Sequence, residues 1–138
     1  MALADNREVP RKIGDFAHHP VATGVQIFAG AIVSINAAGY ALPFVAASGD
    51  PAFAGIARKG ADNTGGADGA ITVEVERGTF HIEHTMSGVT IADVGSAVYA
   101  SDDGTVTTDS GTGDNLAIGK ISGYVGADTA ELRLTTDI

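Results

Sequence analysis

The segment from Ala70 to His84 constrains the fold more than any other part of the chain. Apolar residues occupy the odd positions from Ile71 to Val75 and polar residues the even ones, which is the period of a strand with one buried face. After Gly78 the apolar residues, Phe80 and Ile82, lie at even positions. Because a shift of one residue turns every side chain to the opposite face, the pattern predicts a β-bulge at Gly78 in a strongly curved sheet.

The rest of the chain is typical of short strands joined by turns that are rich in glycine and aspartate. The 138 residues include 19 glycines and no tryptophan, and no amphipathic helix of ten or more residues is apparent. We therefore expect one small all-β domain. Strands are predicted at residues 24–28, 31–36, 40–45, 53–58, 97–100, 105–108, 117–125 and 130–134, a loop at 60–69, and a strand or short helical turn at 89–94.

A weak internal repeat divides the domain into two similar parts. Each part contains a glycine-bounded strand and turn, then a Gly-Asp pair before another strand, then a Gly-Ala-Asp triplet before an alternating strand. The matched segments are Gly30–Gly39 with Gly95–Gly104, Gly49–Ala57 with Gly113–Gly119, and Gly66–Asp68 with Gly126–Asp128. We interpret this as two similar β-units in one small β-barrel or β-sandwich of β-tulip-like form. Independent repetition of common turn residues is the alternative.

Residues 1–20 differ in composition from the rest. They contain Arg7, Arg11 and Lys12, which are three of only eight cations, and Pro10 and Pro20, with no regular apolar period. We interpret this segment as an extended N-terminal arm that precedes a β-domain at residues 21–138. The alternative is a first edge strand packed on the domain.

The formal net charge of −9 restricts the partners of the chain. Binding of DNA or RNA requires clustered cations, and an anionic membrane surface has the same requirement, so neither partner is expected. Cysteine is absent, which excludes disulfides and thiolate metal sites. No apolar run is long enough to span a membrane, and the first residues lack an apolar signal core. We expect the protein to stay in the cytoplasm unless it leaves inside a larger assembly.

Few residues form patterns that could perform catalysis or bind a metal. In the run from His81 to His84, His81 and Glu83 share one face of a strand and His84 lies on the other, so two ligands remain where zinc needs three or four. His18 and His19 are adjacent and diverge on an extended chain; a pH-sensitive contact and a solvated pair are both possible. Neither a Gly-x-Ser-x-Gly motif, a calcium-loop spacing nor a phosphate loop occurs. We expect no catalytic residue, metal or cofactor, and a non-enzymatic protein.

Several short sequence motifs within residues 21–134 resemble those of the capsid-cement (head-decoration) proteins of tailed bacteriophages. The most specific are the Val-x-Val-Glu-x-Gly-x-Phe run and the Gly-x-x-Val-Tyr element. The matching residues are Gly30 and Val33, Gly55–Ala57, Val73–Phe80, Val94–Tyr99, Gly104–Val106, Ile118–Gly119 and Ala130–Leu134. The segment before Pro20 is longer and more polar than this family's compact pattern requires.

The resemblance implies a structural virion protein without an active site. It implies a barrel-like domain that binds the major capsid protein on the outer surface of the capsid, as a homotrimer at three-fold positions, after assembly in the host cytoplasm. We expect the arm to add a strand to a capsid edge, with Arg7, Arg11, Lys12, His18 and His19 in contact with the capsid. The alternatives are a tail or spike β-domain, a carbohydrate-binding module, which the scarcity of aromatic residues disfavours, and a metal hydrolase around His81 and His84.

Overall fold

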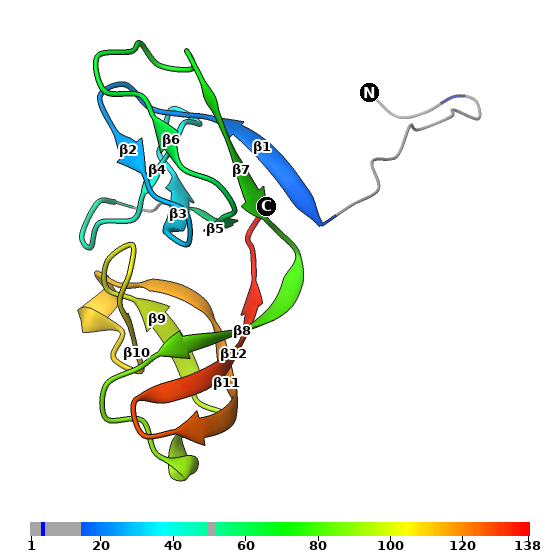
Figure 1. Cartoon of the computed structure of the whole chain (residues 1–138), viewed down its shortest axis with the longest axis vertical. Coiled ribbons are helices and arrows are strands. Elements are labelled where there is room, and N and C mark those ends of the chain that lie inside the picture. The colour runs from blue at the N-terminus through cyan, green and yellow to red at the C-terminus, as the bar shows by residue number, and fades with distance from the viewer. Residues whose placement is uncertain (1–3, 5–14, 50–51) are drawn as a thin grey trace.

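The protein is all-β in its computed structural model, which describes residue 4 and residues 15–49 and 52–138 (Figure 1). Two five-stranded antiparallel sheets, one from each half of the chain, form the domain. The described part contains no helix long and apolar enough to cross a membrane. The predicted all-β architecture of two units is therefore confirmed.

The first sheet has the strand order β1-β7-β5-β3-β4. Its strands are β1 (Phe16–Pro20), β3 (Ile32–Ile35), β4 (Ala41–Pro43), β5 (Ala52–Ala57) and β7 (Thr72–Glu76). A two-stranded ribbon, β2 (Gln26–Ile27) with β6 (Ala61–Asp62), belongs to the same half of the chain, and β6 lies inside the segment predicted as a loop. We call residues 15–76 the first β-unit.

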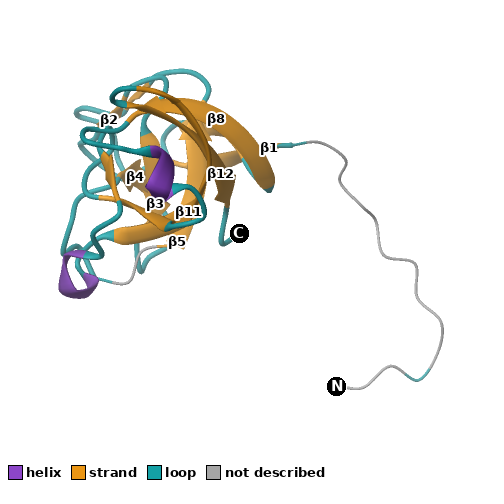
Figure 2. Cartoon of the chain, turned by 90° about the horizontal axis from the view of Figure 1, so that it is seen from below, coloured by secondary structure: helices purple, strands orange, loops and turns teal. Residues whose placement is uncertain are grey.

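The second sheet has the strand order β10-β9-β11-β12-β8. Its strands are β8 (Thr79–Thr85), β9 (Ala97–Ala100), β10 (Val106–Thr107), β11 (Leu116–Gly126) and β12 (Thr129–Thr135). Two single-turn 3-10 helices, η1 (Ile91–Asp93) and η2 (Gly111–Gly113), lie between them. Figure 2 shows β8, β11 and β12 curving around the interior of this half. We call residues 79–135 the second β-unit.

Gly78 lies between two strands, so the prediction of a bulge within one strand is wrong. The parity change is real, because Val73 and Val75 are buried whereas Phe80 and Ile82 pack against the other core. However, β7 belongs to the first sheet and β8 to the second. Gly78 has a φ of 87°, in the left-handed region that glycine tolerates best. The chain therefore reverses its buried face by passing from one sheet to the other.

The predicted arm ends earlier than Pro20. Residues from Phe16 to Pro20 form the edge strand β1, in which Phe16 pairs with Glu76 and Pro20 with Thr72. A strand that ends in proline is suited to an edge, because proline has no N–H to donate to a further strand. The edge-strand alternative holds for these five residues, and residues 5–14 of the predicted arm lie outside the described residues.

Two apolar cores hold the domain together. The first lies within the first β-unit and includes Val33, Val73 and Val75. The second joins the units, because Ile32, Phe44 and Phe53 of the first half pack with the interior residues of the second. Adjacent residues of β3 thus face different cores, which explains why this strand is buried on both faces and shows no alternation.

The two β-units share one topology. Replacing β1, β3, β4, β5 and β7 by β8, β9, β10, β11 and β12 converts the first strand order into the second. The register follows the same correspondence, since Ile35 pairs with Ala41 in one unit and Ala100 with Val106 in the other. Gly30 then aligns with Gly95 and Gly39 with Gly104 without a gap, as the sequence repeat predicts. The topology favours two similar units over chance repetition of turn residues.

Each unit contains a register shift at the same place. In the first unit the shift adjoins the pair formed by Val33 of β3 and Gly55 of β5. In the second unit it adjoins the pair formed by Val98 of β9 and Gly119 of β11, so the two glycines are equivalent. This corrects the predicted alignment, which placed Gly55 against Ala117. A Cβ atom at Gly55 would overlap the backbone carbonyl oxygen of Glu76, and one at Gly119 would overlap that of Arg133. Glycine at both positions allows the bulged strand to approach its neighbour closely.

Gly55→Ala and Gly119→Ala should each destabilise the fold by roughly 1–3 kcal/mol, because the added methyl group must displace a neighbouring backbone. Gly126→Ala is the matched control, since it also lies in β11 but its Cβ would meet no atom within 4 Å. Urea unfolding at equilibrium measures the three changes. Equal stability of Gly119→Ala and Gly126→Ala would show that the close approach of β11 and β12 is not required.

Candidate interaction surfaces

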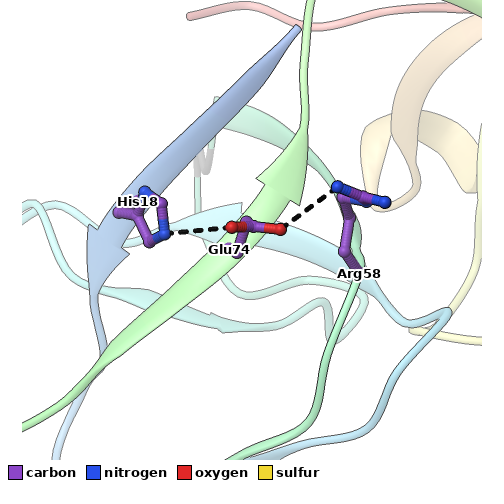
Figure 3. Close-up of polar contacts among 3 residues, drawn as sticks. All are labelled: His18, Arg58 and Glu74. Atoms are coloured by element: carbon purple, nitrogen blue, oxygen red, sulfur yellow. Dashed lines mark hydrogen bonds and ion pairs between the residues drawn. The ribbon is translucent and has the colours of Figure 1, made fainter.

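The outer face of the first sheet carries a row of three polar side chains (Figure 3). His18 on β1 lies opposite Glu74 on β7, and its Nε2 atom is 3.1 Å from Glu74 Oε2. Arg58, which follows β5, places its Nη1 atom 3.3 Å from Glu74 Oε1. We call this row the His18–Glu74–Arg58 row. One carboxylate therefore joins residues from three neighbouring segments of the sheet.

Arg58 also contacts the beginning of the edge strand. Its guanidinium carbon lies 3.9 Å from the centroid of the Phe16 ring, in the geometry of a cation–π contact. The side chains of His18 and Arg58 are 61% and 46% exposed, so each contact contributes little to the free energy of unfolding. Their combined effect is to hold the first three residues of β1, from Phe16 to His18, against the sheet.

His19 occupies the opposite face of β1 and packs on the sheet. It lies opposite Val73, and its Nε2 atom is buried without a hydrogen-bond partner. Burial lowers the pKa of His19, and the positive charges of Arg77 and His18 lower it further. His19 is thus a neutral, half-buried residue at pH 7, whereas His18 is exposed and paired.

Acidification should weaken the fold through His19. Because its pKa is lower in the folded than in the unfolded state, the unfolded chain binds more protons below about pH 6.5, and stability falls as the pH decreases. We expect His19→Val to reduce the loss of stability between pH 7 and pH 5, measured by urea unfolding. At pH 8 the imidazole is neutral in both states, so any difference there reports packing alone. An unchanged slope below pH 6.5 would contradict this role.

The second sheet places the His81–His84 run as its alternation predicts. His81 and Glu83 are exposed on the outer face of β8, while His84 lies on the inner face and its Nδ1 atom is 2.7 Å from the carbonyl oxygen of Thr85. Across the sheet, His81 lies opposite Arg133 and Glu83 lies opposite Glu131. Within the described residues no group of three or more histidines and carboxylates is placed to hold a metal ion.

A hollow of about 160 Å³ lies where the units meet. Phe44, Gly49, Asp114 and Leu116 are among its lining residues, and among those that the structure describes Asp114 has the one titratable side chain. The backbone N–H of Ala47 donates to the carbonyl oxygen of Asp114 beside it. A single carboxylate provides neither a pair of acid and base groups nor a metal-ligand set.

The residues predicted to contact a capsid fall into two groups. Arg7, Arg11 and Lys12 lie outside the described residues. His18 and His19 lie on the edge strand, where His18 contacts the carboxylate of Glu74 and His19 packs on the sheet. A role of these five residues in capsid binding stays a prediction. Comparison with protein-family models, curated proteins and solved structures finds no match to this chain.

Sequence reasoning missed the His18–Glu74–Arg58 row. The alternation around Glu74 correctly predicted that its side chain faces outward, but nothing local indicated its partners. His18 and Arg58 reach it only because β1, β7 and the end of β5 lie side by side. The equivalence of the two units is the one signal that could have directed attention to this row. It aligns Glu74 with Glu131 and His18 with Glu83, so polar residues occupy the same positions in both sheets.

Proposed function

We propose that this protein binds the outer surface of a bacteriophage capsid and stabilises the shell by bridging neighbouring capsomers. The proposal rests on the resemblance described above and on the place where the chain enters the domain. That place is the edge strand β1, preceded by Arg7, Arg11 and Lys12. The carrying observation is this combination of a sheet edge with a preceding segment that has three cations, beside the carboxylates of Asp5 and Glu8, in a chain whose net charge is −9.

An edge position has a direct consequence for attachment. A segment that continues from an edge strand starts at the margin of the sheet and needs no opening of the domain to reach another protein. Such a segment can add a strand to an edge of the partner, where backbone hydrogen bonds supply affinity. The segment contains cations although the net charge of the whole chain is −9. Because opposite charges attract, these cations favour an acidic patch on the partner.

Self-association as a homotrimer forms part of the proposal. A trimer presents three basic segments to one site, so the second and third contacts form at a high effective concentration. Each contact can then be weak while the assembly stays bound. Addition of many copies to one lattice raises the barrier to rupture of a shell that is under pressure from packaged DNA.

Deletion of residues 1–14 should abolish binding to capsids while the domain stays folded. The deletion ends at Gly14 because the carbonyl oxygen of Asp15 accepts a hydrogen bond from the Arg77 N–H, and β1 follows directly. Binding is measured by co-sedimentation with shells assembled from the major capsid protein encoded nearest to this gene. Circular dichroism and thermal unfolding show whether the truncated protein keeps its sheets.

A finer variant tests the charges. Replacement of Arg7, Arg11 and Lys12 by alanine should weaken binding about tenfold or more, since each cation that faces an acidic patch contributes to affinity. Lys59→Ala removes an exposed cation from the folded domain and is the matched control. Full binding by the truncated protein would exclude the segment as the attachment point. Cryo-microscopy of virions distinguishes the alternatives, because a tail or spike protein would place this density away from the capsid.

A further inference from the structure

The exposed edges of the two sheets differ in how well they resist pairing with another chain. The four edge strands are β1, β4, β8 and β10. β1 and β4 end in proline, and β10 contains only two residues. Short strands and proline both prevent edge-to-edge association. In contrast, β8 has seven residues and contains neither proline nor lysine, so it is the best template for strand pairing among the described edges.

The charges on β8 do not match those of its own neighbour. His81 lies opposite Arg133 and Glu83 opposite Glu131 on the outer face of the sheet, so a carboxylate faces a carboxylate and an imidazole faces a guanidinium. Charges of like sign directly opposite each other, here the carboxylates of Glu83 and Glu131, destabilise a strand pair. Exchange of His81 and Glu83 would give two favourable pairs with β12. The order observed is therefore the unfavourable one for an isolated chain.

The equivalent row of the first sheet is matched. There His18 faces Glu74, and Arg58 pairs with the same carboxylate. In the second sheet Glu83 replaces His18, Glu131 replaces Glu74, and the neighbour of Glu131 is Ser122, whose hydroxyl donates a hydrogen bond of 2.8 Å to it. The mismatch on β8 is thus not a property of the architecture that the units share.

We infer that β8 pairs in antiparallel fashion with β8 of a second copy of this chain, around a two-fold axis at Ile82. This register places His81 opposite Glu83 of the second copy, and Glu83 opposite its His81. It also places Thr79 opposite Thr85. Two imidazole–carboxylate pairs form by symmetry, and each copy supplies the seven-residue edge strand β8 to the other. The charge order that opposes pairing with β12 is the order that this contact requires.

The inference does not depend on the proposed function. An isologous contact at β8 doubles the mass of a monomer, and it joins copies of the proposed trimer into a larger assembly. Loss of the contact therefore lowers the mass in either case. It leaves residues 1–14 and binding to a capsid unaffected.

Charge exchange on β8 tests the contact. Glu83→Lys places lysine opposite His81 of the second copy, and His81→Glu places glutamate opposite its Glu83. Each single variant should weaken association at least about tenfold at pH 7, because Glu83→Lys removes both imidazole–carboxylate pairs and His81→Glu replaces them with two carboxylate–carboxylate pairs. The double variant, His81→Glu with Glu83→Lys, restores opposite charges and should return affinity to within about threefold of the original. Sedimentation-velocity ultracentrifugation over a concentration series measures all four proteins.

Folding of the variants provides a second readout with the opposite sign. Within one chain, Glu83→Lys places lysine opposite Glu131, and His81→Glu places glutamate opposite Arg133, so both changes improve pairing with β12. In dilute solution, where the chains are dissociated, neither variant should unfold at a lower temperature than the original. A lower mass combined with an unchanged or higher unfolding temperature supports the contact. Equal masses of the original and both single variants would overturn it.

Cysteine cross-linking tests the register, since the chain has no cysteine of its own. Thr79 and Thr85 are both exposed on the outer face of β8. Directly opposite residues of antiparallel strands have Cα atoms about 4.5–5.5 Å apart, within reach of a disulfide. Under mild oxidation a mixture of Thr79→Cys and Thr85→Cys proteins should give a disulfide-linked dimer, whereas each protein alone should give little. A mixture that cross-links no better than the separate proteins would exclude this register and the two-fold pairing with it.

Discussion

The passage of the chain from the first sheet to the second at Gly78 is the constraint on which the rest of the structure depends. At this glycine the chain leaves β7 and enters β8, and the apolar side chains change from odd to even positions. The C-terminal residues return to the same place, because the backbone N–H of Thr136 donates to the carbonyl oxygen of Gly78, and the Gly78 N–H donates to Thr136 Oγ1. Asp137 continues the contact through two hydrogen bonds with the backbone of Phe53.

This arrangement explains why the units form one domain. The second unit has a core of its own, but Ile32, Phe44 and Phe53 of the first half complete it. Burial of these side chains is a larger contribution to stability than the exposed ion pairs of the outer faces. The outer faces are therefore the part of each unit that can change without loss of the fold. The matched row at Glu74 and the mismatched row at Glu131 occupy equivalent positions on two such faces.

The two units thus share a topology but differ in their edge strands β1 and β8. In the first unit, β1 is held by an ion-pair row and ends in proline, and the basic segment of residues 1–14 precedes it. In the second unit, β8 is longer, and its Glu83 lies opposite Glu131 of its own sheet. The proposed function assigns the first edge to a capsid and the inferred contact assigns the second to self-association. The two roles involve separate residues and can be tested separately.

The sequence by itself determined the all-β class, the positions of most strands and the change of parity at Gly78, and its weak repeat indicated the two similar units that the topology then supported. These features follow from local alternation and turn residues, since a strand with one buried face must show a period of two. Tertiary structure decided that Gly78 separates two sheets, that Phe16–Pro20 form an edge strand, and that Glu74 lies between His18 and Arg58. It also decided that Glu83 faces Glu131. Pairing between distant strands depends on which faces share a core, and residues far apart in the chain determine that together.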